Sequence, residues 1–235
     1  MKKDNLKKYL TIIVVIIGLI AIIYLLPYAK AITTEEGRLF FKNKVKDLGI
    51  WGLVILILMQ LVQILLVVLP GEPMEILAGM CYGGFWGTIF IMLTSSIFST
   101  IIFLLVRKYG KNIIYLFFNK EKVNKILDSK IFKNTKKLEL VILLLFLIPG
   151  TPKDLVVYIG GLLPIKASKF IVISSLARFP SVISGVLAGT NIIAGNWLVS
   201  LLVYGITFLL VGITILIINK FDKDKTTNKI FKAFK

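Results

Sequence analysis

Long apolar runs, separated by short clusters of charged residues, make up most of the chain. The longest runs occupy residues 10–26, 50–69, 85–106, 170–190 and 197–219. Each is close to the roughly 20 residues that a helix needs to cross a bilayer. A further run at 140–148 has only 9 residues, which is about 14 Å of helix and half a membrane. The pattern predicts an all-α integral membrane protein in which some helices stop at half depth.

A short turn motif occurs twice inside this hydrophobic sequence. Residues 69–75 read Leu-Pro-Gly-Glu-Pro-Met-Glu, and residues 148–154 read Ile-Pro-Gly-Thr-Pro-Lys-Asp. A repeated, proline-broken turn is typical of secondary transporters, in which discontinuous helices meet at membrane depth. We therefore predict two helical hairpins whose tips are formed by Pro70, Gly71, Pro73, Pro149, Gly150, Thr151 and Pro152.

Composition supports the membrane assignment and excludes several kinds of chemistry. The chain is 57% hydrophobic with a mean hydropathy of +0.89, whereas soluble domains are about 45–50% apolar. Of its 29 basic residues, the lysines lie between and beyond the apolar runs, so we interpret them as topology signals and lipid contacts, not as a nucleic-acid site. With no histidine and one cysteine, Cys81, we expect no disulfide within the chain, no metal, no cofactor and no enzyme activity.

The distribution of basic residues predicts the orientation of the helices. Lysines before residue 10 place the N-terminus in the cytoplasm, and we expect 10–26 to be a retained anchor helix, although residues 29–31 resemble a signal-peptidase site. Residues 107–137 carry ten Lys/Arg and two acids. The positive-inside rule keeps them cytoplasmic only if 50–84 forms a hairpin that returns to the outside before 85–106 crosses inward.

The second half repeats this arrangement from the other face. The short run at 140–148 enters from the cytoplasm and turns at 149–152, after which 170–190 crosses outward and 197–219 crosses inward. The prediction is an inverted repeat with two opposed re-entrant helical hairpins plus about four transmembrane helices. Both termini are then cytoplasmic. Because exposed backbone at membrane depth is tolerated only within protein or along a cavity, the two tips should face each other.

Three parts of the chain follow from this topology. We expect an N-terminal anchor with an external amphipathic segment at 1–49, a core with both hairpins at 50–190, and a last transmembrane helix with a basic tail at 191–235. The excess of lysine and isoleucine suggests an AT-rich bacterial genome, and hence the bacterial inner membrane. A homo-oligomer is compatible with the sequence.

Five ionisable residues fall at predicted membrane depth and are candidates for substrate contact or proton coupling: Glu72, Glu75, Lys153, Asp154 and Arg178. An Asp, Lys or Arg at a helix centre costs about 2.5–3.5 kcal/mol on insertion, so such residues usually face an interior or a pathway. A plainer interpretation remains open, in which the acids form ion pairs with the two cations.

Thr151, Asp154 and Arg178 have further alternative roles. Thr151 and Asp154 have the spacing of a capping box, with Pro152 at the first helical position, so they are also candidates for capping the returning helix. Arg178 lies nine residues past Lys169, about 13 Å deeper along a helix. It is either a buried partner for one of the acids or a phosphate clamp, because a guanidinium fork matches phosphate oxygens.

The paired hairpins resemble a known family over roughly residues 50–190. The first motif is followed by Gly79, Gly83, Gly87, Arg107 and Gly110, and the second by Tyr158, Gly160, Gly161, Phe170, Arg178 and Pro180. In this order they resemble the two halves of a VTT domain, which places the chain near the DedA/VTT superfamily (SNARE-associated Golgi protein family), in a bacterial Tvp-like branch. The resemblance implies opposed re-entrant hairpins and movement of lipids between leaflets. Eukaryotic relatives are phospholipid scramblases, and some DedA relatives are implicated in proton-dependent recycling of undecaprenyl phosphate.

We therefore predict a lipid translocase, similar to a scramblase or a flippase. It would move an anionic phospholipid or a polyprenyl phosphate between leaflets, and proton coupling of this movement is left open. Arg178 and Lys153 would neutralise the phosphate, the dipoles of the returning helices would favour the anion, and Glu72, Glu75 or Asp154 would carry the proton. Two alternatives stay open: a small-solute or ion secondary transporter that uses the same site, and a non-transporting membrane organiser in which the charges only pair.

Overall fold

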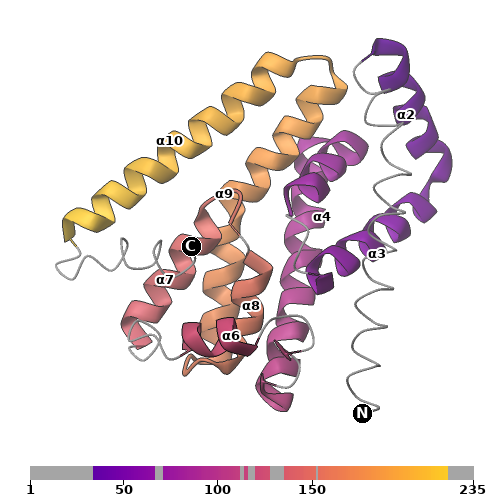
Figure 1. The fold of residues 1–235 in the computed structure, drawn as a ribbon. Coiled ribbons are helices and arrows are strands. Elements are labelled where there is room, and N and C mark those ends of the chain that lie inside the picture. Colours follow the sequence, from indigo (N-terminus) through magenta and orange to yellow (C-terminus); the bar gives the residue numbers. More distant parts are fainter. Residues whose placement is uncertain are drawn as a thin grey trace.

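The structure is a computed structural model that describes residues 34–66, 71–111, 114–115, 120–127, 135–151 and 153–221. The described residues form helices joined by short turns and contain no β-strand. The helices are α2 (Glu35–Leu48), α3 (Ile50–Leu66), α4 (Glu72–Tyr109), α6 (Lys120–Leu127), α7 (Thr135–Leu147), α8 (Lys153–Leu162), α9 (Ala167–Ile193) and α10 (Trp197–Phe221) (Figure 1). The all-α prediction is confirmed for this part of the chain. The predicted anchor at 10–26, the tip residues Pro70 and Pro152, and the tail from residue 222 lie outside it.

Three of the described helices are long and apolar enough to cross a membrane: Glu72–Tyr109, Ala167–Ile193 and Trp197–Leu216. The pair Glu35–Leu48 and Ile50–Leu65 would make a fourth span if it were counted as one, but it bends by 101° between its two helices. Large apolar side chains are exposed along these helices, such as Leu93 on α4, Leu176 on α9 and Leu201 on α10. Such surfaces suit lipid, which agrees with an integral membrane protein.

Helix α4 is interrupted at Gly83. This residue has φ 77° and ψ 178° within an otherwise helical segment, a backbone conformation that is essentially restricted to glycine. The interruption leaves a first part of α4 from Glu72 to residue 82, about 16 Å long, and a longer second part that continues to Tyr109. The sequence places the end of its first hairpin at residue 84, one residue past this break.

Helices α4 and α9 pack so closely that their backbones touch. A Cβ atom at Gly79 would overlap the carbonyl group of Val186, and one at Gly189 would overlap the carbonyl group of Ile76. Small residues allow this approach in membrane helices, where packing replaces the hydrophobic effect as the main attraction. Helix α9 also contacts α7 and α10, so it is the central helix of the described bundle (Figure 1).

Helix α8 packs into the lower half of the bundle, against the second part of α4. A Cβ at Gly161 would lie 2.7 Å from the Cβ of Val106. Close by, the ring of Phe170 stacks on that of Phe103 with centroids 4.3 Å apart and meets Phe146 edge-on at 6.2 Å. These rings come from α9, α4 and α7, so the aromatic cluster joins three helices around α8.

Arg107 closes the C-terminal end of α8. Its guanidinium donates hydrogen bonds to the carbonyl oxygens of Gly161, Leu163 and Ile165 at 2.8, 3.0 and 2.9 Å. Carbonyl groups at a helix end have no partner within the helix, and a cation there satisfies them and opposes the helix dipole. Arg107 therefore fixes the end of α4 to the turn between α8 and α9.

Candidate functional site

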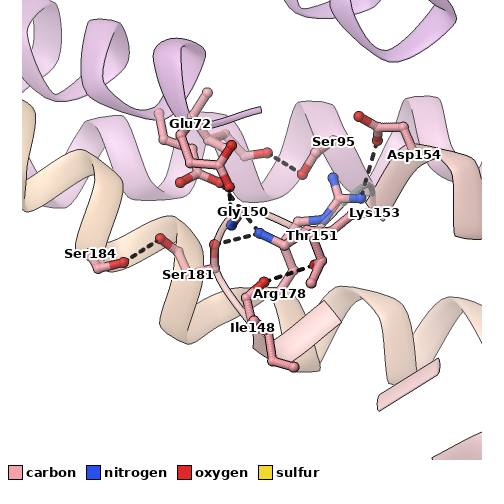
Figure 2. A network of polar contacts seen from close by, with 12 residues as sticks. Glu72, Ser95, Ile148, Gly150, Thr151, Lys153, Asp154, Arg178, Ser181 and Ser184 are labelled. Carbon is pink, nitrogen blue, oxygen red and sulfur yellow. Dashed lines mark hydrogen bonds and ion pairs between the residues drawn. The ribbon is translucent and has the colours of Figure 1, made fainter. Parts of the chain in front are cut away.

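The two copies of the turn motif are in direct contact. The backbone N–H of Gly150 donates a hydrogen bond of 2.6 Å to Oε1 of Glu72, across 78 positions of the chain (Figure 2). Gly150 has φ +78°, a value that favours glycine over any residue with a side chain. A carboxylate that accepts from an N–H makes one of the stronger hydrogen bonds in proteins. The bond therefore joins the first tip to the second.

The first copy places two carboxylates on the first turn of α4. The carbonyl of Gly71 accepts from the N–H groups of Met74 and Glu75 at 3.0 and 3.2 Å, which starts the helix. Glu72 and Glu75 are three residues apart and so share one face. An acid in the first turn is favoured by the helix dipole, but Glu75 is only 4% exposed and needs further compensation.

Lys153 provides part of that compensation from the second copy. Its Nζ lies 4.0 Å from Oε1 of Glu75 and donates a hydrogen bond to Oγ of Ser181 on α9. The other oxygen of Glu75, Oε2, is buried and has no hydrogen-bond partner among the described residues. A Cβ atom at Gly185 would overlap this oxygen, so the carboxylate of Glu75 rests directly on the backbone of α9.

Asp154 and Arg178 form a second pair next to the first. Oδ1 of Asp154 lies 3.7 Å from Nη2 of Arg178, and its Oδ2 accepts a 2.7 Å hydrogen bond from Nε2 of Gln63 on α3. Nη2 of Arg178 also donates to Oγ of Ser99 at 3.2 Å, and the guanidinium lies over the ring of Phe146. Arg178 is 5% exposed, so the sequence's open question about its partner is answered by Asp154.

The hydroxyl of Thr151 contacts the helix before it. It donates to the carbonyl oxygen of Ile148 at 2.8 Å and to that of Leu145. The sequence predicts instead that Thr151 and Asp154 cap the start of α8. The described bonds of Thr151 satisfy carbonyl groups at the end of α7, and those of Asp154 go to Gln63 on α3 and Arg178 on α9.

The structure thus brings all five predicted ionisable residues into one cluster at the two tips. Three carboxylates face two cations there, so with every group ionised the cluster carries one uncompensated negative charge. Four of the five are buried, whereas Glu72 is partly exposed. A buried ion that loses its partner is strongly destabilising. The cluster can therefore exchange partners, accept a proton on a carboxylate or bind a group that donates hydrogen bonds. Removal of one charged side chain would leave its partner buried and uncompensated. No group of three or more potential metal-binding side chains occurs in the described parts of the chain.

Comparison with known proteins assigns the family. A family model of the VTT domain, the domain of the DedA/SNARE-associated Golgi family, matches residues 69–191. The chain belongs to the VTT domain family. No curated protein and no solved structure matches it. The matched VTT domain runs from the first tip almost to the end of α9 and therefore contains the five ionisable residues, whereas all of α3 and all of α10 lie outside it.

Two kinds of residue around the charged cluster of the VTT domain were not predicted from the sequence: Gln63, Ser99 and Ser181, which bond to it directly, and Gln60, which bonds to Gln63. Gln60 and Gln63 are the only polar side chains in the run 50–69, and Nε2 of Gln60 lies 3.4 Å from Oε1 of Gln63. Because two amides three residues apart are unusual in an apolar run, Gln60 and Gln63 could have been recognised from the sequence. Ser99 and Ser181 gave no such signal, because serine is frequent throughout α4 and α9.

Proposed function

We propose that this VTT-domain protein is a lipid translocase of the bacterial cell membrane, which moves lipids with an anionic phosphate headgroup between leaflets. The observation that carries this proposal is the contact between Glu72 and Gly150, with buried charges directly behind it (Figure 2). Two helix starts, α4 and α8, meet at this point, and each directs its positive dipole end toward the tips. An anionic phospholipid or a polyprenyl phosphate supplies the charge that such a site favours.

We infer that the helices around the tips form two opposed re-entrant hairpins, related as an inverted repeat. Three observations support this. The break at Gly83 separates the first part of α4 from its membrane-spanning part. The first part of α4 packs on α9 through Gly79, and α8 packs on the second part of α4 through Gly161. Each short helix therefore packs on the long helix of the other copy, as an intertwined repeat requires.

The basic residues orient this arrangement in the proposal. Arg107 contacts the carbonyl of Ile165, so the end of α4 and the start of α9 lie side by side. Lys108, Lys111, Lys166 and Lys169 are at these two helix ends. The positive-inside rule assigns this end to the cytoplasm. The turn between α9 and α10, at the other end of α9, then lies outside (Figure 1).

The chemistry of the proposal is an exchange of partners. A phosphate oxygen of the headgroup competes with Asp154 for Arg178, whose fork suits two phosphate oxygens, and with Glu75 for Lys153. Asp154 keeps the hydrogen bond from Gln63. A carboxylate that loses its cation and gains no other hydrogen-bond donor takes up a proton, since a bare buried charge is costly. Glu72, Glu75 and Asp154 are the candidate proton carriers. The acyl chains stay in the bilayer throughout.

One observation favours a second candidate, a cation transporter with the same site. The buried side-chain atoms that lack a hydrogen-bond partner among the described residues are Oε2 of Glu75 and Oε1 of Gln60. Both are oxygen acceptors, which suit a cation or a hydrogen-bond donor. In this alternative the uncompensated carboxylate binds a small cation, and lipid does not enter the site.

A liposome assay tests the proposal against this alternative. Purified protein is reconstituted into vesicles that contain fluorescent phosphatidylglycerol, and a membrane-impermeant reductant bleaches the outer leaflet. We expect the protected fraction to fall well below the half that remains in protein-free vesicles, and Arg178→Ala protein to resemble protein-free vesicles. Unchanged protection with correctly folded protein, for both anionic and zwitterionic labelled lipids, would refute lipid translocation. Proton or sodium flux in the same vesicles would then support the cation transporter.

A further inference from the structure

Helix α10 lies outside the matched VTT domain, yet one of its faces is directed at the bundle. Ser200 and Val211 on α10 are buried, and Tyr204 lies between them and is partly buried. Residues 200, 204 and 211 share one face of a helix, since they are four and seven positions apart. Leu202 and Leu209, on the opposite side of the helix, are exposed. Tyr204 is therefore directed toward α9 and not toward lipid.

A hydrogen bond between α9 and α10 sets the level of Tyr204. Oγ of Ser200 donates to the carbonyl oxygen of Ala188 at 2.9 Å. The two helices are joined by a short turn and run in opposite directions (Figure 1). One helical turn onward in α10 reaches Tyr204, and one turn back in α9 reaches Ser184 and Gly185. Gly185 is the residue on which the carboxylate of Glu75 rests.

The electrostatics of the site agree with this placement. Glu75 and Glu72 both lie near enough to Tyr204 to act electrostatically on its hydroxyl. Among the described residues the Tyr204 hydroxyl has no hydrogen-bond partner, and Oε2 of Glu75 has none either. A phenol supplies an O–H donor, and a carboxylate accepts. Two complementary groups thus lie at the same level of α9 without being joined.

We propose that Tyr204 is a positioning residue of the tip site, which donates its hydroxyl hydrogen to Oε2 of Glu75 when α10 closes on α9. The proposal deepens the lipid-translocase function and rests on it. Lys153 is the cation partner of Glu75 in the described state. A hydrogen bond from Tyr204 compensates the carboxylate without a positive charge, so Lys153 becomes free for a headgroup phosphate. The proton stays on the tyrosine, and the net charge of the cluster is unchanged.

The packing of α10 allows such a movement. Only 17% of its apolar span is buried, compared with 50% for α9. The main helix contact of α10 is with α9. Gly205, next to Tyr204, has open space where a Cβ atom would stand. The helix is therefore held along one side only and can shift inward by the small distance that a hydrogen bond needs.

The first test removes one oxygen atom. Tyr204→Phe keeps the ring but has no donor, and its matched control is Tyr109→Phe, an exposed tyrosine at the end of α4. We expect Tyr204→Phe to slow transfer of labelled phosphatidylglycerol by about tenfold, the effect of losing one hydrogen bond to a charged group. Tyr109→Phe should transfer at the wild-type rate. Wild-type transfer by Tyr204→Phe would overturn the proposal.

A double-mutant cycle separates positioning from simple packing. If Tyr204 acts through Glu75, Tyr204→Phe should have little further effect on transfer once Glu75→Gln is present, because the amide cannot use the same charge-assisted bond. Equal losses in both backgrounds would show a packing role and overturn the proposal.

The last test does not require lipid movement, so it distinguishes a failure of this inference from a failure of the proposed function. In a Cys81→Ser background, cysteines at positions 184 and 204 should form a disulfide on mild oxidation in liposomes. Cysteines at 184 and 209 should not, because Leu209 is directed away from α9. No cross-link between 184 and 204 overturns the placement of Tyr204. A cross-link in protein that moves no lipid supports the placement and refutes the translocase.

Discussion

The two copies of the turn motif share their backbone pattern but differ in their charges. The first copy contributes only carboxylates, Glu72 and Glu75, and Oε2 of Glu75 has no partner among the described residues. The second copy contributes Lys153 and Asp154, and both have charged partners and hydrogen bonds. The repeat therefore supplies the place where the tips meet, whereas divergence between the copies supplies the different charges.

The short helices that follow the tips are also held in different ways. The first part of α4 lies against α9 by direct backbone contact at Gly79 and Gly189. Helix α8 is held by aromatic packing and by the three carbonyl bonds of Arg107. Backbone contact leaves no space for adjustment, while side chains can change rotamer. We infer that the first short helix is the more rigid of the two.

The largest effect is expected from breaking the backbone contact of the first copy. Gly189→Val places a side chain where the carbonyl of Ile76 stands, and neither helix backbone can move away. We expect a loss of at least about 3 kcal/mol in the free energy of unfolding, measured by denaturant titration in detergent micelles. Gly212→Val, at a glycine with open space around it, is the control. A stable Gly189→Val protein would contradict the close packing of α4 on α9.

The next effect concerns the paired charges of the second copy. Arg178→Ala removes the ion-pair partner of the buried Asp154 and leaves its hydrogen bond from Gln63, which should destabilise the protein by about 3–5 kcal/mol and abolish lipid transfer. Arg178→Lys should retain part of the transfer at most, because lysine lacks the bidentate fork. Removing both charges with Arg178→Gln and Asp154→Asn should restore stability but not transfer. Full transfer by a well-folded Arg178→Ala protein would remove this residue from the site.

A smaller effect is expected at the contact between the copies. Glu72→Gln keeps an acceptor for the Gly150 N–H but loses the charge assistance, so we expect about 1 kcal/mol of destabilisation in thermal unfolding. Glu72→Ala should cost more. The same variants test coupling, since glutamine cannot take up a proton. If pH dependence of lipid transfer persists in both Glu72→Gln and Glu75→Gln, then Asp154 is left as the proton carrier.

The smallest effect on activity is expected from single surface cysteines. They nevertheless give the sharpest test of how the two copies are oriented in the membrane. In a Cys81-free protein, cysteines at positions 120 and 137 should react with an impermeant reagent only from the cytoplasm, and those at 35 and 194 only from outside. Transfer rates should stay at the wild-type value. Labelling of position 120 from outside would refute the opposed arrangement of the hairpins.

The sequence by itself determined the class of the protein and the positions of the residues that we propose for its site. Partitioning into lipid depends on the length and composition of local runs, so the membrane helices could be predicted from the chain alone. Proline and glycine break helices for local steric reasons, so the repeated motif predicted where breaks occur. The same motif led to four ionisable residues, and the apolar run 170–190 led to a fifth, Arg178. The structure gathers all five in one cluster. The polar side chains of Gln60 and Gln63 interrupt an apolar run, so they too could have been predicted from the sequence as contacts of the cluster.

Only the tertiary structure decided which groups are partners. The sequence left Arg178 with three candidate acids, and the structure pairs it with Asp154. In the structure the hydroxyl of Thr151 donates to the carbonyl of Ile148 at the end of α7, although the capping pattern predicted a bond to the start of α8. Tyr204 had no local signal at all. Ion pairs depend on distances between helices, and those distances are set where Gly79, Gly185 and Gly189 bring α4 and α9 into contact across more than a hundred residues. No local pattern in the chain encodes such a distance.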